Sequence, residues 1–199
     1  TVLGPASGDQ ACGEVGVGRM LEPLEIAETV AGLLSPKLLS GARVLITAGP
    51  TFEPIDAVRG ITNRSSGKMG YAIARAALDA GAKVTLISGP VSLSAPAGAE
   101  ITQVVTAAEM FDAVKRNAAR TDIYIGVAAV ADYRADKPRQ HKIKKTDSKQ
   151  LELKLVPNPD ILAWIAGRPH PPFCVGFAAE SRNPDAYAEE TRRRKKVQL

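Results

Sequence analysis

Apolar residues along this chain follow two spacings, one typical of buried strands and one typical of amphipathic helices. Five short apolar runs predict strands, at Arg43–Thr47, Lys83–Ser88, Ile101–Val105, Ile123–Ala128 and Phe173–Phe177. Apolar residues recur at helical spacing in Gly67–Ala80, Ala107–Ala119 and Asp185–Arg194. Because strands and helices alternate, we expect an α/β fold with a parallel sheet.

Two further segments lie outside that alternation. Glu22–Leu34 is predicted to form one amphipathic helix, with Pro23 in its first turn and Ser35-Pro36 at its end. Leu151–Val156 alternates apolar and polar residues. We expect it to form, with Lys142–Lys145, a half-exposed antiparallel excursion that reaches a neighbouring chain.

The loop after the first predicted strand points to a nucleotide site. It is long and rich in Gly, Pro and Ser, and it leads into an alanine-rich helix. The start of a helix presents unpaired backbone N–H groups and the positive end of a dipole, which suits a phosphate. The residues at that start are Ser65, Ser66, Gly67 and Lys68.

Two well-known phosphate-binding patterns do not fit this loop. A Walker loop has a glycine where Thr62 stands and Ser or Thr where Met69 stands. The dinucleotide pattern has a glycine where Ser65 stands and an acidic residue after the second strand, where Ser88-Gly89-Pro90 follows instead. An NAD(P)-dependent reductase is therefore a weaker alternative. The glycines taken alone fit close helix–strand packing equally well.

Composition narrows the remaining classes of function. The 199 residues are 45% hydrophobic, enough for one substantial core, and they contain neither a run long enough to span a membrane nor a signal peptide, so we expect a cytoplasmic protein without a membrane partner. The two cysteines and two histidines lack the spacing of a disulfide framework or zinc site, and Cys174 is expected in the core.

Positive charge is uneven along the chain, whose net charge is +5. One cluster spans Lys137–Lys145 and another spans Arg192–Lys196. Either suits polyphosphate, although a solvated helix end is the favoured explanation of the second. A basic nucleic-acid-binding module remains a minor alternative, because aromatic residues are only 5% and do not interleave with the clusters.

Six ordered blocks of sequence resemble the phosphopantothenoylcysteine synthetases of coenzyme A biosynthesis. The longest is GPT-x-E-x-ID-x-VR-x-ITN-x-SSGKMG, and the others are SGPVSL, GVAAVADYR, KIKK, NPDIL and VGFAAES. Residues Ala6–Met20 resemble the end of the flavin-dependent decarboxylase that precedes the synthetase in bacterial bifunctional chains. We therefore expect a decarboxylase remnant and linker helix at 1–39, and at 40–199 a synthetase domain that is incomplete at its C-terminus.

The resemblance implies a Rossmann-like, doubly wound fold with a mostly parallel sheet and a small antiparallel excursion. It also implies a two-step reaction, in which CTP with Mg²⁺ activates 4'-phosphopantothenate as an acyl-cytidylate that L-cysteine then attacks. A homodimer is expected, and a higher homo-oligomer in the intact bifunctional chain. FMN would be bound only by that intact chain, where Cys12 matches the decarboxylase proton donor. No decarboxylation is expected from this chain by itself.

The resemblance also assigns roles to residues of this chain. Asn63, Arg59 and Lys142 match catalytic positions, although Asn63 also suits a helix cap and Arg59 an ion pair with Glu53 or Asp56. Asp132 and Asp160 are the candidate magnesium ligands. Lys195 matches a nucleotide lysine, but Thr191 replaces the lysine one turn earlier, and core packing is the alternative for Phe177. The predicted nucleotide-binding residues are Gly49, Ser65, Ser66, Gly67, Gly126, Val127, Ala128, Asp132, Lys142, Pro159, Asp160, Ile161, Leu162, Phe177 and Lys195.

Overall fold

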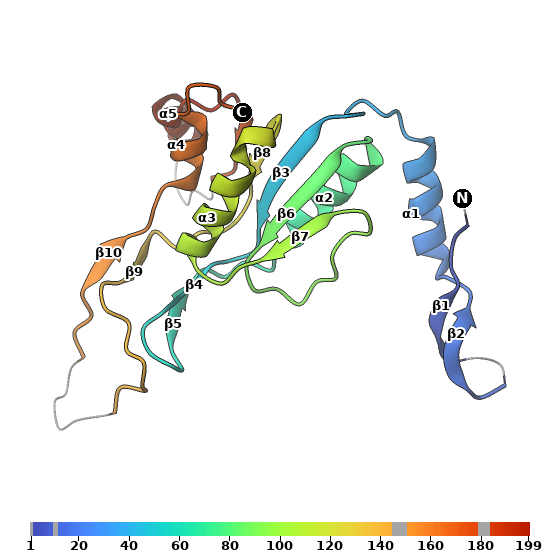
Figure 1. Cartoon of the computed structure of the whole chain (residues 1–199), viewed down its shortest axis with the longest axis horizontal. Helices are drawn as coiled ribbons and strands as arrows, with labels where there is room; N and C mark the ends of the chain where they lie inside the picture. The colour runs from blue at the N-terminus through green and yellow to red at the C-terminus, as the bar shows by residue number, and fades with distance from the viewer. Residues whose placement is uncertain (1, 10–11, 145–150, 179–183) are drawn as a thin grey trace.

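The computed structural model describes residues 2–9, 12–144, 151–178 and 184–199. Its centre is a parallel sheet of five strands with the order β11-β8-β3-β6-β7 (Figure 1). The strands are β3 (Arg43–Ala48), β6 (Lys83–Ser88), β7 (Glu100–Gln103), β8 (Ile123–Gly126) and β11 (Phe173–Gly176). All five predicted strands are confirmed, each within two residues at either end.

Helices cover both faces of this sheet, which confirms the doubly wound α/β fold. On β3, Val44, Ile46 and Ala48 pack with α2 on one face, whereas Leu45 packs with α3 and α4 on the other. The sequences of such strands are continuous apolar runs because both faces of the sheet are buried. The helices are α2 (Lys68–Asp79), α3 (Ala107–Asn117) with a 3₁₀ turn at Ala118–Arg120, α4 (Ile161–Ala166) and α5 (Pro184–Lys195).

The local sequence explains where two of these helices sit. Thr106 and Glu109 form a capping box that starts α3, each side chain accepting a backbone N–H of the other. In α2, a Cβ on Gly70 would lie 2.5 Å from the Cβ of Ala48. Close approach of α2 to β3 therefore requires glycine at position 70.

The strand order reverses between β3 and β8. The chain runs from β3 outward through β6 to β7, then returns to β8 on the other side of β3. In open α/β sheets, ligands bind beyond the carboxyl ends of the strands at such a reversal. This fold thus directs the search for a site to the loops that follow Ala48 and Gly126.

The antiparallel excursion is present, but its predicted pairing is wrong. β9 (Tyr133–Ala135) pairs with β10 (Leu155–Pro157), and Lys142–Lys144 form no strand; Lys145 lies outside the described residues. The two chain segments that continue from these strands extend away from the sheet (Figure 1). We call residues 133–144 and 151–157 together the arm.

Two short hairpins were not predicted from the sequence. β1 (Ala6–Asp9) pairs with β2 (Val15–Arg19) ahead of α1 (Pro23–Leu34), the helix expected there, and this N-terminal unit lies on the side of the sheet away from the arm (Figure 1). β4 (Phe52–Pro54) pairs with β5 (Gly60–Thr62) inside the long loop after β3. No helix of the described residues is both long and apolar enough to cross a membrane.

Candidate functional site

The loops after β3 and β8 are bonded to each other at the strand reversal. Val127 donates its backbone N–H to Thr47 (3.1 Å), and Ala129 donates to Gly49 (2.9 Å). Thr51 in turn donates to the carbonyl of Ala129 (3.3 Å). The pairing of these strands therefore continues past their ends and places the two loops against one another.

The side chain of Asn63 contributes to this junction between the loops after β3 and β8. Its side-chain amide nitrogen donates to the carbonyl oxygens of Ala129 and Val130, each at 3.1 Å. Buried Thr51 supports the same contact, since its hydroxyl accepts the N–H of Ala131 (3.0 Å). Asn63 is exposed and does not cap α2, so the alternative interpretation as a helix cap is wrong.

The start of α2 is tightly packed. Gly49 and Gly67 both have left-handed backbones, with φ of +73° and +76°, and a Cβ on either would come within 2.9 Å of the Cγ1 of Val91. The hydroxyls of Ser65 and Ser66 accept the N–H groups of Gly67 (3.3 Å) and Lys68 (3.5 Å). The serines thus satisfy two of the amides that were expected to meet a phosphate.

Arg59 makes the ion pair that was its alternative interpretation. Its Nε lies 2.9 Å from Oδ2 of Asp56, and its Nη2 also donates to the carbonyl of Ile143 (2.9 Å). The Arg59 guanidinium, followed by backbone N–H groups of Ile143, Val58 and Arg59, holds the pKa of the Asp56 carboxyl well below its usual range. A substrate contact for Arg59 stays a prediction.

Lys142 stands next to this pair in the arm. Its side chain is exposed and makes no hydrogen bond or ion pair with the described residues. Ile143, its neighbour, is held by both Asp56 and Arg59. An exposed cation on an anchored backbone suits an anionic ligand.

The two candidate magnesium ligands differ in their surroundings. Asp160 caps α4 by accepting the N–H of Ala163 (3.0 Å), and its other oxygen pairs with Lys195 of α5 (2.9 Å). The Asp132 carboxylate is exposed, with no hydrogen bond or ion pair to the described residues. Within the described part of the chain, no three acidic, histidine or cysteine side chains gather around a point.

The remaining predicted nucleotide residues lie near the carboxyl ends of the same sheet strands. Gly126, Val127 and Ala128 are partly exposed, and Phe177 donates its backbone N–H to Gly126 (3.3 Å). Phe177 is 50% exposed, so core packing does not explain it. Ile161, by contrast, has its side chain in the core, and only its backbone remains available at the start of α4, which follows Pro159. Leu162 packs against Gly176, where an added Cβ would lie 2.6 Å from the leucine Cδ2.

The two cysteines occupy opposite environments. Cys174 is fully buried in the core, as predicted, and burial raises the pKa of its thiol to about 11. Cys12 is exposed in the turn between β1 and β2. The structure therefore places Cys12 away from the carboxyl ends of the sheet strands, where the candidate site lies.

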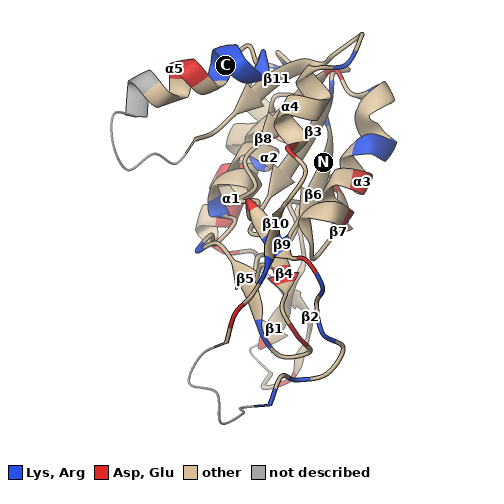
Figure 2. Ribbon diagram, turned by 90° about the vertical axis from the view of Figure 1, so that its left-hand side faces the viewer, with Lys and Arg blue, Asp and Glu red and all other residues tan. Residues whose placement is uncertain are grey.

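Basic residues gather on α5 and along the arm (Figure 2). On α5, Glu189 binds both Arg192 and Arg193, and these bonds lower the pKa of its carboxyl to about 2. Lys195 is bound by Asp160. Two carboxylates, those of Glu189 and Asp160, therefore offset part of the positive charge of the second basic cluster.

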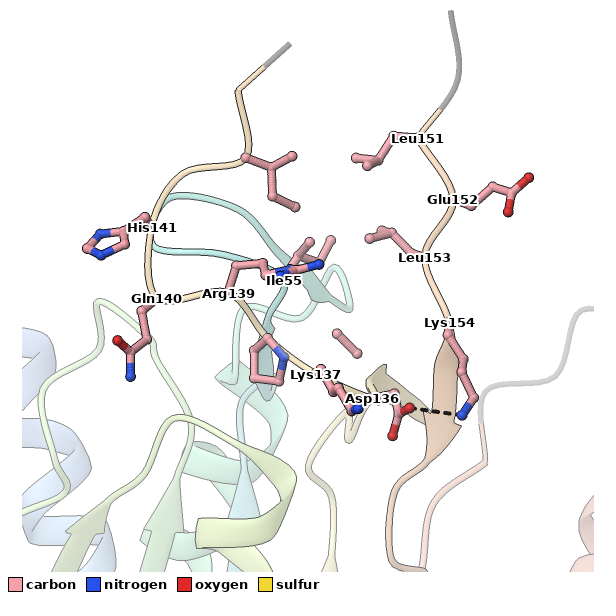
Figure 3. A pocket seen from close by; sticks show the side chains of 13 residues that line it. Ile55, Asp136, Lys137, Arg139, Gln140, His141, Leu151, Glu152, Leu153 and Lys154 are labelled. Carbon is pink, nitrogen blue, oxygen red and sulfur yellow. Dashed lines mark hydrogen bonds and ion pairs between the residues drawn. The ribbon is translucent and has the colours of Figure 1, made fainter. Parts of the chain in front are cut away.

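A cavity of about 910 Å³ lies in the arm rather than at the carboxyl ends of the sheet strands. Leu151 and Leu153 point from one segment of the arm towards Ile55 and Arg139 opposite (Figure 3). Asp136 and Lys154 pair at its base (2.9 Å). Its open, largely apolar lining suits another protein surface better than a polyphosphate.

Several residues that build the site were missed as participants. Thr51 and Asn158 hold the loop after β8, the latter through the carbonyl of Ala131 (2.8 Å), while Asp56 holds the arm and Val91 covers the glycines. Thr51 and Asp56 lie within the block that carried the resemblance. The pairing of Asp56 with Arg59 was one of the predicted alternatives, but nothing in the sequence identified Ile143 as a partner of Asp56 or Ala131 as a partner of Thr51.

Residues 39–199 match the family described as the DNA/pantothenate metabolism flavoprotein C-terminal domain. The chain is 53% identical over 189 residues to the coenzyme A biosynthesis bifunctional protein CoaBC of Vibrio parahaemolyticus, covering 94% of this chain and 47% of that protein. It is 50% identical over 202 residues to the Escherichia coli K12 protein of the same name, covering 100% of this chain and 50% of that protein. The chain thus spans about half the length of these relatives.

The fold agrees with a solved structure. The crystal structure of the C-terminal domain of a coenzyme A biosynthesis bifunctional protein CoaBC superposes with a TM-score of 0.72 at 42% identity, covering 82% of this chain and 76% of that one. The family match, over residues 39–199, includes the strand reversal and its loops. The chain belongs to the family of DNA/pantothenate metabolism flavoprotein C-terminal domains.

Proposed function

We propose that this chain is a ligase of coenzyme A biosynthesis that joins 4'-phosphopantothenate to L-cysteine at the expense of CTP. The observation that carries the proposal is its identity of 50–53% with proteins named for coenzyme A biosynthesis, together with the junction of Asn63 and the loop after β8. That junction lies where this fold binds ligands.

The reaction requires a carboxylate to become a good leaving group. The carboxylate of 4'-phosphopantothenate attacks the α-phosphate of CTP, pyrophosphate leaves, and an acyl-cytidylate forms. The amine of cysteine then attacks the acyl carbon and releases CMP. Charge develops on phosphate oxygens in the first step and on the acyl oxygen in the second, so fixed cations and hydrogen-bond donors lower both barriers.

This chain supplies groups suited to each step. Lys142, exposed on an anchored backbone, would balance charge on the departing pyrophosphate. The Asn63 amide now donates to the carbonyls of Ala129 and Val130. During attack by cysteine it would release one of these carbonyls and donate to the acyl oxygen instead. Backbone groups of Gly126–Ala128 would bind the cytosine edge.

We also propose a cytoplasmic location.

Magnesium would neutralise triphosphate charge when bound with CTP. Mg²⁺ keeps several waters and takes one or two carboxylates in such sites, so one free carboxylate is enough. Asp132 fits this role, because its carboxylate is exposed at the end of the loop after β8. Asp160 fits less well, since Lys195 and the α4 cap already use both oxygens.

The reductase alternative conflicts with the packing around α2. A dinucleotide places its pyrophosphate against the glycines at the start of this helix. Here the Val91 side chain packs directly on Gly49 and Gly67. The basic binding module is also less favoured, because Glu189 of α5 pairs with Arg192 and Arg193, and Asp160, the N-cap of α4, pairs with Lys195.

We further propose that the arm joins two copies of the chain as a homodimer. Leu151, Leu153 and Leu155 are 56%, 40% and 43% exposed along one segment of the arm, and Tyr133 is 54% exposed on the other. Burying such a surface in a second copy is favourable. Light scattering after size exclusion should give twice the chain mass.

Ligand-dependent thermal stability tests the proposed nucleotide. CTP with Mg²⁺ at about 100 times its dissociation constant should add roughly 2.7 kcal/mol of stability. Lys142→Ala should reduce the gain, whereas Lys83→Ala, which changes an exposed lysine at the other end of the sheet, should retain it. Stabilisation by NADPH or duplex DNA, with none by CTP, would contradict the proposal.

A further inference from the structure

Asp56 is a buried carboxylate whose partners all come from two segments. Its side chain is fully buried, and Oδ1 accepts the backbone N–H groups of Val58 and Arg59, both at 2.9 Å. Oδ2 accepts from Nε (2.9 Å) and Nη2 (2.5 Å) of Arg59 and from the backbone N–H of Ile143 (3.0 Å). A loop after β3 is thereby bonded to a residue 87 positions later.

Both backbone polar groups of Ile143 are held by this pair. Its N–H donates to Asp56, and its carbonyl accepts from Nη2 of Arg59 at 2.9 Å. Among described residues 140–144, these are the only backbone hydrogen bonds; the preceding contact is Arg139 to the carbonyl of Ile55 (2.9 Å). We call this arrangement the Asp56–Arg59 clamp.

We propose that Asp56, through the Asp56–Arg59 clamp, is a positioning residue for Lys142 in the nucleotide step. The inference rests on the proposed function, in which Lys142 meets the triphosphate of CTP. Lys142 directly precedes Ile143 in the sequence, so the clamp also fixes the backbone from which the Lys142 side chain extends. Without the clamp, binding would also have to order the 140–144 segment, which costs conformational entropy.

The position requires a carboxylate rather than an amide. Five N–H groups from Val58, Arg59 and Ile143 converge on the two oxygens. In Asp56→Asn, the amide nitrogen would face at least two of these donors whichever way the side chain turned. The size of the side chain is nearly unchanged, so the loss comes from the changed charge and hydrogen bonding rather than from packing.

A matched control lies at the amino ends of the sheet strands, opposite the candidate site. Asp122, which precedes β8, accepts from the backbone N–H of Arg43 (2.8 Å), its Nε (2.9 Å) and its Nη2 (2.6 Å). This is also an Asp–Arg fork with a backbone bond. Asp122→Asn should therefore lower stability without altering the arm.

The test combines amide hydrogen exchange by NMR with CTP titration in Mg²⁺ buffer. Asp56→Asn should remove the protection of the Ile143 amide and weaken CTP binding by about tenfold or more, the size expected for hydrogen bonds to a charged group. Asp122→Asn should change neither. In a Lys142→Ala background, Asp56→Asn should weaken CTP binding little further, because both changes act through one contact.

Three outcomes overturn the proposal. If Asp56→Asn exposes the Ile143 amide while CTP affinity stays at the wild-type value, the clamp does not position Lys142. If the Asp56→Asn loss is as large without Lys142 as with it, the clamp acts through another group. If wild-type chain shows no CTP binding, the proposed function fails and the positioning role with it, whereas Ile143 protection still reports the clamp.

Discussion

The side-chain nitrogen of Asn63 lies 3.1 Å from the carbonyl oxygen of Ala129, across the point where the strand order reverses. One residue thereby joins the loop after β3 to the loop after β8. An amide donor directly after β5 is thus held where a parallel α/β sheet binds ligands. This contact supports the proposal that Asn63 acts in the acyl-transfer step.

Asn63→Asp should separate the two half-reactions. A carboxylate cannot donate to the acyl oxygen, so capture by cysteine should slow by about 10²–10³-fold, the range for loss of one oxyanion donor. Pyrophosphate release should change much less, leaving acyl-cytidylate on the enzyme. Quenched-flow separation of CMP from pyrophosphate measures this. Equal slowing of both products would show that Asn63 acts only by holding the loop.

Glu53→Ala should destabilise the fold through the start of α3. Glu53 is buried, and its Oε1 accepts the N–H of Ala107 at 2.8 Å. Removing the acceptor leaves a buried donor without a partner, which costs about 1–3 kcal/mol. Urea unfolding gives the difference. Glu53→Gln keeps an acceptor oxygen and should lose less; equal losses would mean that the hydrogen bond is not the cause.

Gly70→Ala should destabilise the protein although alanine favours helices. A Cβ at position 70 would lie 2.5 Å from the Cβ of Ala48 in β3. Overpacking of this kind costs about 1–3 kcal/mol, more than the roughly 1 kcal/mol of helix propensity gained. Met69→Ala, at a half-exposed position of the same helix, should have a smaller effect. A stabilised Gly70→Ala would contradict the close approach of α2 and β3.

Acid should remove the contribution of the Arg43–Asp122 pair. Bonds from Arg43 lower the pKa of the Asp122 carboxyl to about 2 in the folded protein. An unfolded aspartate titrates near 4, so the pair adds stability in full above about pH 4 and loses it as the pH falls towards 2. The stability difference between wild type and Asp122→Asn should therefore shrink over that window. A constant difference would exclude the pair as its source.

Thiol reagents should distinguish the two cysteines. Cys174 is buried with its pKa raised to about 11, so little thiolate is accessible near neutral pH. A disulfide reagent should modify Cys12 in the native chain and reach Cys174 only after denaturant is added. Cys12→Ser, which leaves Cys174 alone, provides the control. Rapid modification of native Cys12→Ser would contradict the buried environment.

The main sheet was predictable because burial on both faces leaves a clear trace in sequence. Val44–Ile46 is apolar without interruption, and glycine-rich loops bound it. The β1–β2 hairpin leaves no such trace, since Val15 and Val17 are 76% and 73% exposed between glycines. The arm was paired wrongly because a three-residue strand, Tyr133–Ala135, is too short to show a period.

The candidate site was less predictable than the fold. The resemblance placed Asn63, Lys142 and the loop after β8 in one site, and Asn63 does contact that loop. Its partners could not be read from spacing, because they lie 66 and 67 residues away and depend on the register of β3 against β8. The role of Asp56 was hidden for the same reason, since Ile143 reaches it only through the fold of the arm.

Pyrophosphate release with labelled CTP tests the central claim most directly. With Mg²⁺ and 4'-phosphopantothenate but no cysteine, the chain should release one pyrophosphate per site and retain the cytidylate. Adding L-cysteine should then release CMP and allow turnover. Pyrophosphate release that is independent of 4'-phosphopantothenate, or none while the chain binds CTP, would contradict its role as a carboxylate–amine ligase.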